Sequence, residues 1–444
     1  MIGSVLHAVR TLGRNAAAVA AHLLRDRRGN VALMFGISAI PITLAVGASV
    51  DYTLASKAKA KLDAAADAAA LAAASHTALK LSATDAQAFA ISVFNQAAST
   101  LTDASVGTVT ATVTDTTQGR SVDVNYTASR PTKFVGIVGI KTMAINGKSY
   151  AASGIPTYID FYLLLDNTPS MGVGATPSDV STMVNNTPDQ CAFACHDMSA
   201  APNDYYSLAK SLGVTMRIDV VRQATQNLMD TATSTAAVSG QFRMAIYDFG
   251  TSVSNAGLTK IFSLSSSLSS AKTAAGNIDL MSTPYQNYNS DQGTDFDNAL
   301  VSMNGEIATP GDGTSASSPQ KILFFVSDGV ADAYYPSSCS QPTNGGRCQE
   351  PLTVANCTTM KNRGIKIAVL YTTYLALPTN AWYMTWIDPF NQGPYNPSVN
   401  SKIAQNMQAC ASPGFYFEVS PTQGISTAMN ALFQKVVATA RLTK

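Results

Sequence analysis

The chain has 444 residues, which is too long for one ordinary domain and predicts two or three. Apolar residues make up 46% of it and charged residues only 13%, a composition too apolar for wholesale disorder. With 29 lysines and arginines against 28 aspartates and glutamates, the formal net charge is +1. The chain therefore lacks the basic excess of a nucleic-acid-binding protein, and we expect no nucleic acid as a partner.

The first predicted element is an apolar helix near the N-terminus. Residues 31–50 contain no charged side chain, and twenty helical residues span about 30 Å, the thickness of a bilayer's hydrocarbon core. Pro41 lies inside this run, but transmembrane helices tolerate proline. Residues 1–30 carry five arginines against one aspartate. The positive-inside rule therefore predicts that residues 1–29 form a cytoplasmic basic segment and that the bulk of the chain lies outside the cytoplasm.

A cleavable signal peptide is the alternative interpretation of this segment. The apolar region of such a peptide normally has about 7–15 residues. The apolar run here is longer, and the helical pattern continues past it without a break. The sequence therefore favours a retained single-pass membrane anchor.

The six cysteines all fall in the part of the chain predicted to lie outside the cytoplasm. An even number of cysteines in an oxidising compartment indicates three disulfides, although fifteen pairings are possible. Short loops favour pairing Cys191 with Cys195 and Cys339 with Cys348, which leaves Cys357 with Cys410.

Residues 30–80 are predicted to form one helix that starts in the membrane and continues as an alanine-rich stalk. Residues 53–80 contain 13 alanines, and alanine is the best helix former. These small side chains suit close packing against a partner helix, while a solvated stalk without contacts is the alternative. Residues 81–155 are predicted to form a small α+β module. Its strongest signal is period-two alternation on both sides of a turn within residues 107–126, typical of a hairpin, and residues 131–152 should add a short helix and a strand.

Residues 156–444 are predicted to form an α/β domain. Short apolar runs, typical of strands buried on both faces, alternate with helical stretches, and this alternation predicts a doubly wound, mostly parallel sheet. Polar loops interrupt the pattern and carry five of the six cysteines, as expected of disulfide-pinned surface insertions. The strand-like runs are 158–165, 242–249, 322–326, 365–370 and 415–419, the helical stretches are 216–231, 296–307 and 424–440, and the loops lie near 172–207, 331–358 and 374–400.

Oxygen-bearing side chains follow the predicted strands of this domain. Asp166, Thr168 and Ser170 come after the first strand, Thr294 precedes a helix, and Asp328 ends the third strand. In open α/β sheets, ligands bind outside the carboxyl ends of the strands. Two carboxylates and three hydroxyls, without sulfur or imidazole, are hard ligands that suit Mg²⁺ or Mn²⁺. A loop aspartate that caps the following backbone N–H groups is the alternative for the first of these residues.

The pattern Asp166-x-Thr168-x-Ser170, with the distant Thr294 and Asp328, resembles the metal-ion-dependent adhesion site of von Willebrand factor type A domains. The resemblance implies a von Willebrand factor A-like fold, direct metal contacts from the three hydroxyls and largely water-mediated contacts from the two aspartates. It also implies that an acidic side chain of a protein ligand completes the metal shell. The sequence departs from the usual pattern by a threonine at the second motif position and by a proline that follows it.

The N-terminal segment carries a second resemblance. Its basic, glycine-containing start, its apolar helix, the Asp51-Tyr52 pair and the alanine-rich stalk are similar to the head of TadE/TadG-like proteins of tight-adherence (Flp) pilus systems. With the C-terminal domain, the whole layout resembles the TadG type. The resemblance implies a non-enzymatic component of pilus assembly or adhesion in the bacterial inner membrane, with the bulk of the chain periplasmic and other pilus-assembly proteins as partners.

Two other kinds of site fit the sequence less well. The run Cys191-Ala-Phe-Ala-Cys195-His196 is one residue longer than the usual haem-attachment spacing, and it lacks the second thiol pair or histidine that a zinc site needs. Hydrolytic motifs such as GxSxG, HExxH or a P-loop are absent from the sequence. A metal-activated water would need a nearby base, for which Asp295 and Asp248 are the candidates. We therefore predict a membrane-anchored interaction protein that is not an enzyme, with a metal-free scaffold of the pilus machinery as the alternative.

Overall fold

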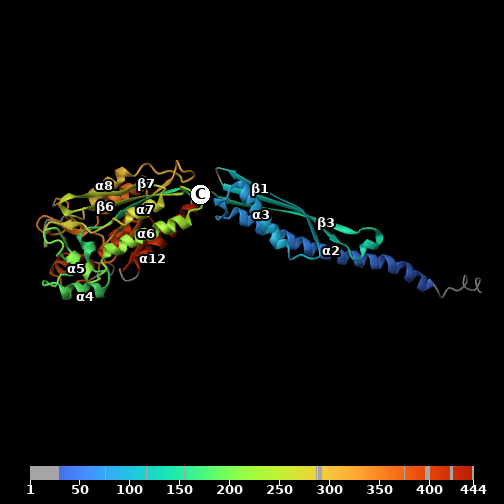
Figure 1. The fold of residues 1–444 in the computed structure, drawn as a ribbon, viewed down its shortest axis with the longest axis horizontal. Helices are drawn as coiled ribbons and strands as arrows, with labels where there is room; N and C mark the ends of the chain where they lie inside the picture. Colours follow the sequence, from blue (N-terminus) through green and yellow to red (C-terminus); the bar gives the residue numbers. More distant parts are fainter. Residues whose placement is uncertain are drawn as a thin grey trace, which may run out of the picture. The chain divides into compact units, whose positions relative to one another are not determined.

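The computed structural model describes residues 30–75, 77–116, 119–154, 156–286, 288, 293–335, 337–374, 376–395, 401–420 and 424–442 (Figure 1). The predicted cytoplasmic basic segment, residues 1–29, lies outside them. The described chain forms two compact units. The first comprises residues up to Asp115 together with Arg120–Ser153, and the second comprises residues 116–119 together with Gly154 to the end.

The first unit is built on one long helix, α2 (Asn30–Ala74). Its N-terminal half exposes apolar side chains such as Leu33, Phe35 and Ile40, each about two-thirds exposed. Leu33–Ala74 is long and apolar enough to cross a membrane. The predicted continuous helix is therefore confirmed as far as Ala74, with Pro41 inside it, but its predicted end at residue 80 is wrong, since Ala78–Lys80 form a separate 3-10 helix.

The C-terminal half of α2 is covered by the rest of this unit. Helix α3 (Ala83–Ala98) packs on it, as does the three-stranded sheet of β1 (Ser105–Thr116), β2 (Gly119–Pro131) and β3 (Thr142–Gly154), in the order β1-β2-β3. The alanine side chains of α2 are small enough to admit Phe94 of α3 and Tyr126 of β2 into the shared core. A stalk without contacts is therefore the wrong alternative for residues 55–74. Two short 3-10 helices complete the unit, η2 (Ala78–Lys80) and η3 (Val135–Val138).

The second unit is centred on a six-stranded sheet in the order β13-β12-β9-β4-β6-β7. If these six strands are numbered in chain order and read from the β7 edge, the order is 3-2-1-4-5-6, which is that of a doubly wound sheet. All neighbours pair in parallel except β7, which is antiparallel to β6 at the edge. The predicted doubly wound, mostly parallel α/β fold is confirmed, while the edge strand β7 was not predicted. The strands are β4 (Ile159–Leu165), β6 (Phe242–Gly250), β7 (Ala256–Ser265), β9 (Gln320–Ser327), β12 (Lys366–Thr372) and β13 (Tyr416–Val419).

Helices cover both faces of this sheet, because alternate strand residues point to opposite sides. Phe161, Leu163 and Leu165 of β4 pack with α6 (Arg217–Thr235), α7 (Leu268–Ala275) and α12 (Ile425–Leu442). Tyr162 and Leu164 face α8 (Phe296–Glu306), α9 (Ala355–Asn362) and α11 (Lys402–Cys410). The helices predicted at 216–231, 296–307 and 424–440 are thus confirmed, and Figure 1 shows α6 beside α12.

Insertions at the carboxyl ends of the strands hold two further small sheets. Disulfides join Cys339 to Cys348 and Cys357 to Cys410, as predicted. The predicted bond between Cys191 and Cys195 is wrong for this structure, where both are thiols and the side chain of Cys195 hydrogen bonds to that of Cys191.

The inserted elements are η4 (Pro169–Gly172), α4 (Pro177–Asn186), β5 (His196–Asp197), α5 (Tyr205–Ser211), η5 (Val253–Asn255), β8 (Ser282–Thr283), β10 (Val330–Ala333), β11 (Cys348–Pro351), the π-helix η6 (Tyr383–Ile387) and α10 (Asp388–Asn391).

Candidate metal-binding site

The predicted site lies where the strand order of the sheet reverses. From the central strand β4 the chain winds first towards β6 and later returns to add β9 on the other side. Asp166 directly follows β4, and Asp328 directly follows the adjacent β9. This switch point is where doubly wound sheets bind their ligands. The two aspartates are brought together because parallel strands end at the same edge.

The five predicted residues form one cluster, which we call the oxygen cluster: Asp166, Thr168, Ser170, Thr294 and Asp328. One carboxylate oxygen of Asp166 accepts hydrogen bonds from the backbone N–H of Thr168 at 3.0 Å and from its hydroxyl at 2.7 Å. The Thr294 hydroxyl donates to the Thr168 hydroxyl at 2.8 Å, and Ser170 Oγ lies 3.4 Å from the same oxygen. The capping role weighed for Asp166 is therefore real, and it coexists with the cluster.

Thr294 reaches the cluster from a distant loop because β10 positions it. Thr294 pairs with Asp332 in an antiparallel bridge, and the backbone N–H of Asp332 donates to the carbonyl of Thr294 at 2.9 Å. The carboxylate of Asp332 is in turn paired with Arg347. Thr168 and Thr294, which are 126 positions apart in the sequence, are thereby held in hydrogen-bonding contact.

A buried guanidinium supplies positive charge beside the two carboxylates. Arg217, at the start of α6, is fully buried, and its Nη1 lies 3.4 Å from a carboxylate oxygen of Asp328. Its Nη2 donates to the carbonyl of Thr373 at 3.3 Å, and its Cζ lies 5.0 Å from the centre of the Tyr374 ring. The sequence reasoning missed this residue, because an arginine at a helix start carries no signal of a partner 111 residues away.

Burial raises the pKa of both carboxyl groups, and repulsion by Asp166 raises that of Asp328 further. Burial raises the pKa of Asp166, against hydrogen bonds from Ser327 and Thr168. Burial first, and the nearby Asp166 second, raise the pKa of Asp328 to about 7, against the attraction of Arg217. Two buried carboxylates with a single guanidinium thus leave negative charge that a bound cation would neutralise.

The donor set fits a small divalent cation. It consists of carboxylate and hydroxyl oxygens only, the ligands that Mg²⁺ and Mn²⁺ prefer. Arg217 and the backbone N–H of Val330 approach the carboxylate of Asp328 at 3.4 Å each, and the side chain of Ser170 also hydrogen bonds to it. Ser170 and Thr294 also line a pocket of about 220 Å³, through which a ligand could reach the cluster.

The side chain of Asn167 anchors the loop that follows β4 to the end of the neighbouring strand β6. Its amide donates to the carbonyls of Gly250 at 2.8 Å and Asp279 at 3.1 Å and to Asp248 at 3.3 Å, while its side-chain oxygen accepts from the backbone of Phe249. These bonds fix the backbone between two members of the oxygen cluster. This role of Asn167 could not be predicted from the sequence.

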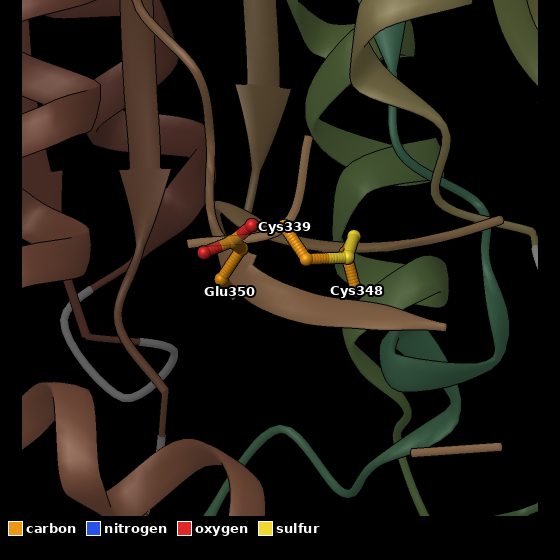
Figure 2. Close-up of side chains that lie close together, drawn as sticks. All are labelled: Cys339, Cys348 and Glu350. Atoms are coloured by element: carbon orange, nitrogen blue, oxygen red, sulfur yellow. A yellow bond between two sulfur atoms is a disulfide. The ribbon is translucent and has the colours of Figure 1, made fainter. Parts of the chain in front are cut away.

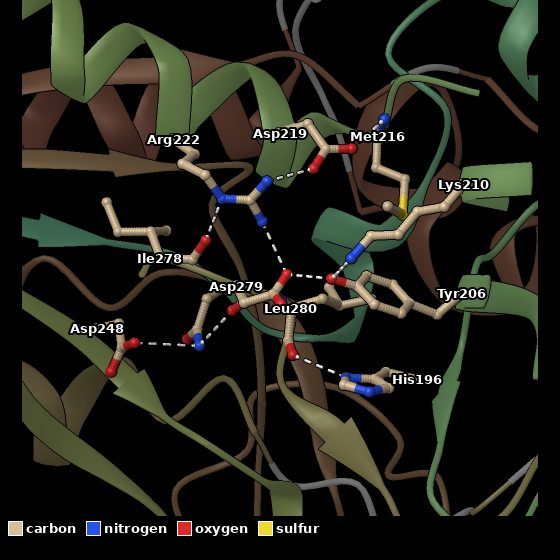
Figure 3. A network of polar contacts seen from close by, with 11 residues as sticks. His196, Tyr206, Lys210, Met216, Asp219, Arg222, Asp248, Ile278, Asp279 and Leu280 are labelled. Carbon is tan, nitrogen blue, oxygen red and sulfur yellow. Dashed lines mark hydrogen bonds and ion pairs between the residues drawn. The ribbon is translucent and has the colours of Figure 1, made fainter. Parts of the chain in front are cut away.

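The carbonyl of Asp279 accepts from Asn167, and Figure 3 shows how the segment around Asp279 is held in turn. Arg222 of α6 donates to Asp279 at 2.8 Å and to the carbonyl of Ile278, and Asp279 also accepts from the hydroxyl of Tyr206 on α5. The amine of Lys210 donates a further hydrogen bond to the hydroxyl of Tyr206. Two helices therefore brace the loop against which the metal-site residues are positioned.

Aromatic side chains surround the pocket above the oxygen cluster. Tyr285, Tyr288, Phe193, Trp382 and Tyr374 line it together with the thiols of the 191–195 loop. This loop is bonded to the site loop, because the backbone N–H of residue 194 donates to the carbonyl of residue 172 at 3.0 Å. The pocket thus adds apolar contact area beside the oxygen cluster, which sequence reasoning did not foresee.

The remaining chemical candidates do not assemble a second site among the described residues. Asp295 caps α8 by accepting from the backbone of Asn298, and the buried Asp248 has its pKa raised to about 7 by desolvation while it contacts Asn167. Figure 2 shows Glu350 beside Cys339 and Cys348, whose sulfurs are bonded to each other and so offer no thiolate to a metal.

Comparison with known proteins places the N-terminal helix in a family. Residues 29–76 match the family model described as Tad, putative Flp pilus-assembly TadE/G-like. The N-terminal segment is TadE/G-like. The match covers helix α2, including its apolar part, and does not reach the second unit. No curated protein matches the chain.

Three solved structures resemble this chain at low scores. The pilus adhesin SpaC from Lactobacillus rhamnosus GG, in its open conformation, is 11% identical with a TM-score of 0.36 over 76% of this chain and 34% of the adhesin. The vWF domain of the type V pili tip protein Mfa5 from Porphyromonas gingivalis is 9% identical, with a TM-score of 0.36 over 65% of this chain and 97% of that domain. A point mutant of the PilB minor pilin from Streptococcus sanguinis is 13% identical, with a TM-score of 0.32 over 77% of this chain and 79% of the pilin. This chain spans about a third of the SpaC adhesin, and scores this low support no conclusion about ligands.

Proposed function

We propose that this chain is a membrane-anchored, non-enzymatic component of a Flp/Tad-type pilus system, whose second unit binds an acidic group of a partner protein through Mg²⁺ or Mn²⁺. The metal would be held by Asp166, Thr168, Ser170, Thr294 and Asp328. The observation that carries this proposal is the convergence of three hydroxyls and two buried carboxylates from three loops at the switch point of the sheet. The bound cation would supply an open coordination position for the partner's carboxylate.

The proposal includes an orientation in the membrane. Helix α2 would cross the bacterial inner membrane once, with residues 1–29 in the cytoplasm and both units in the periplasm. Supporting it are the arginines before the apolar run and two disulfides in the second unit, which suit an oxidising compartment. Other pilus-assembly proteins would be its partners.

Calorimetric titration of Mg²⁺ and Mn²⁺ into the detergent-solubilised full chain tests the metal site. We expect one saturable site, lost in Asp166→Ala and weakened in Thr168→Val, which removes one hydroxyl at nearly constant volume. Asp230→Ala is the matched control, because this aspartate of α6 is exposed and pairs with Lys272 on the surface. Its titration should equal that of the wild type.

Pilus assembly in cells tests whether the metal site matters for function. We expect the double variant Asp166→Ala/Asp328→Ala to reach the membrane but to lose surface pili. If the folded double variant still assembles pili, or if the folded wild type binds no metal, the metal-dependent mechanism is wrong. A metal-free scaffold would then be the better description.

A further inference from the structure

An exposed apolar loop joins β2 to β3 in the first unit. It runs from Lys133 to Lys141 and contains the short helix η3. Ile137 at its tip is 85% exposed, which is an unusual position for a large aliphatic side chain. We call residues 133–141 the apolar loop. Its other exposed large side chains are Phe134, Val138 and Ile140.

A buried aspartate of α2 holds this loop. The carboxylate of Asp51, only 1% exposed, accepts the backbone N–H groups of Lys133 at 2.7 Å and of Phe134 and Val135 at 2.9 Å each. These are the donors at the start of η3 that have no partner within the helix. The loop is therefore pinned to α2 at the residue that directly follows the apolar run.

Phe134 fixes the height of the loop along the helix. A Cβ added at Gly47 would lie 2.5 Å from the Cβ of Phe134, so the two backbones approach closely at a position where a side chain would not fit. Gly47 lies three residues inside the end of the uncharged run 31–50, about 4.5 Å along the axis. The loop thus begins at the level where the membrane-crossing part of α2 ends.

We propose that the apolar loop is a second membrane contact, inserted into the lipid at the outer membrane–water interface beside α2. The inference rests on the membrane-anchoring part of the proposed function and is independent of the metal site. The exposed apolar surface of α2 continues directly into the loop. Tyr52, 67% exposed, lies at the same level, as aromatic residues at membrane interfaces do.

The charges that flank the loop fit a lipid surface. Exposed Lys133 and Lys141 stand at its two ends, where their amines can reach phosphate groups while the residues between them contact acyl chains. With two points of attachment, the loop and α2, the first unit would be restrained from tilting or rotating about a single helix. A Tad partner that binds this unit would then meet it in a defined orientation on the membrane.

Fluorophore labelling of the full chain in vesicles of phosphatidylcholine and phosphatidylglycerol tests the inference. Single cysteines are introduced into a Cys191→Ser/Cys195→Ser background and labelled with an environment-sensitive dye. Ile137→Cys reports on the loop, and Ile40→Cys, at the middle of the apolar run, reports on the span itself. Tyr150→Cys is the matched control in water, because this residue is 64% exposed on β3. Its neighbour Ser149 bonds Asp67, about 24 Å beyond Asp51 along α2.

We expect the dye at position 137 to show a blue-shifted emission and quenching by lipids that carry a nitroxide near the headgroup. The dye at position 40 should be quenched by nitroxides deep in the acyl chains, and the dye at position 150 by neither. A lipid-buried position 40 with a water-exposed position 137 overturns the loop inference and leaves the anchor intact. Water exposure at both positions overturns the anchor and the loop together.

Discussion

The buried ion pair between Arg217 and Asp328 brings positive charge to the site. Both side chains are fully buried, and Asp166 lies close enough to raise the pKa of Asp328 further. Two carboxylates in this environment need more positive charge than one guanidinium provides. Arg217 therefore stabilises the metal-free protein, but the site keeps enough negative charge for the binding of a cation to be favourable.

Replacing Arg217 by methionine should destabilise the second unit and increase its dependence on metal. Removing one partner of a buried pair leaves the other uncompensated and costs about 3–5 kcal/mol. Because Mg²⁺ would neutralise the same carboxylates, it should raise the melting temperature of Arg217→Met more than that of the wild type. Thermal unfolding of the solubilised chain with and without Mg²⁺ measures both effects.

Lys272→Met is the control for this substitution. Its pair with Asp230 is largely exposed, and such pairs contribute at most about 1 kcal/mol. The control should therefore melt close to the wild type, with an unchanged response to Mg²⁺. Equal melting temperatures for Arg217→Met and the wild type would show that the buried pair has no such role.

The residues of the site were predictable to different degrees. Asp166, Thr168, Ser170, Thr294 and Asp328 could be assigned because their motif spacing and positions after strands are written in the sequence. Arg217, Asn167 and Ser327 could not, since each acts through a contact that exists only once distant loops meet. The fate of the cysteines was only partly accessible, because loop length favours the 191–195 pairing whereas the structure keeps both as thiols.

At the scale of elements, the alanines of α2 decide the packing of the first unit. Ala66, Ala69, Ala70 and Ala73 are completely buried, whereas Ala64 and Ala68 on the opposite face are exposed. The buried stripe admits α3 and the sheet at close range. It also explains why composition alone left the question open, since alanine favours a helix equally well with or without a partner.

Ala69→Leu and Ala68→Leu form a matched pair that tests this packing. Both changes have nearly the same effect on helix propensity, but only Ala69 faces the core. Overpacking there should cost about 1–3 kcal/mol, while Ala68→Leu should be nearly neutral. Hydrogen exchange of α3 and β2 should accelerate in the first variant alone. Equal exchange in the two variants would contradict a closely packed helix face.

The strands of the second unit were predicted more reliably than its edges. The buried parallel strands are short apolar runs bounded by polar loops, and the five predicted runs all became strands. Strand β7 escaped prediction because it is half-exposed at the edge and mixes serine, threonine and lysine with its apolar residues. The short elements of the insertions are stabilised by tertiary contacts and disulfides, so local sequence does not specify them.

At the scale of the whole molecule, charge and disulfides both favour the proposed orientation. Five arginines precede the apolar run and two disulfides follow it, whereas the chain as a whole is nearly neutral. These features act through different physical causes. Arginines resist translocation across the membrane, and disulfides require an oxidising compartment. Their agreement makes the orientation testable independently of the metal site and of the apolar loop.

Reporter fusions after Lys444 should show this orientation directly. An alkaline phosphatase, active only outside the cytoplasm, should be active, and a green fluorescent protein exported by the same route should be dark. Changing Arg25, Arg27 and Arg28 to glutamine removes most of the charge bias and should lower phosphatase activity per molecule, because a fraction of chains would insert the other way. Changing Lys57, Lys59 and Lys61 to glutamine is the control on the opposite side of the apolar run, and it should leave the phosphatase active. If the phosphatase fusion of the unmodified chain is inactive and the green fluorescent protein fusion is fluorescent, the proposed topology is wrong. The oxygen cluster would then lie in the cytoplasm.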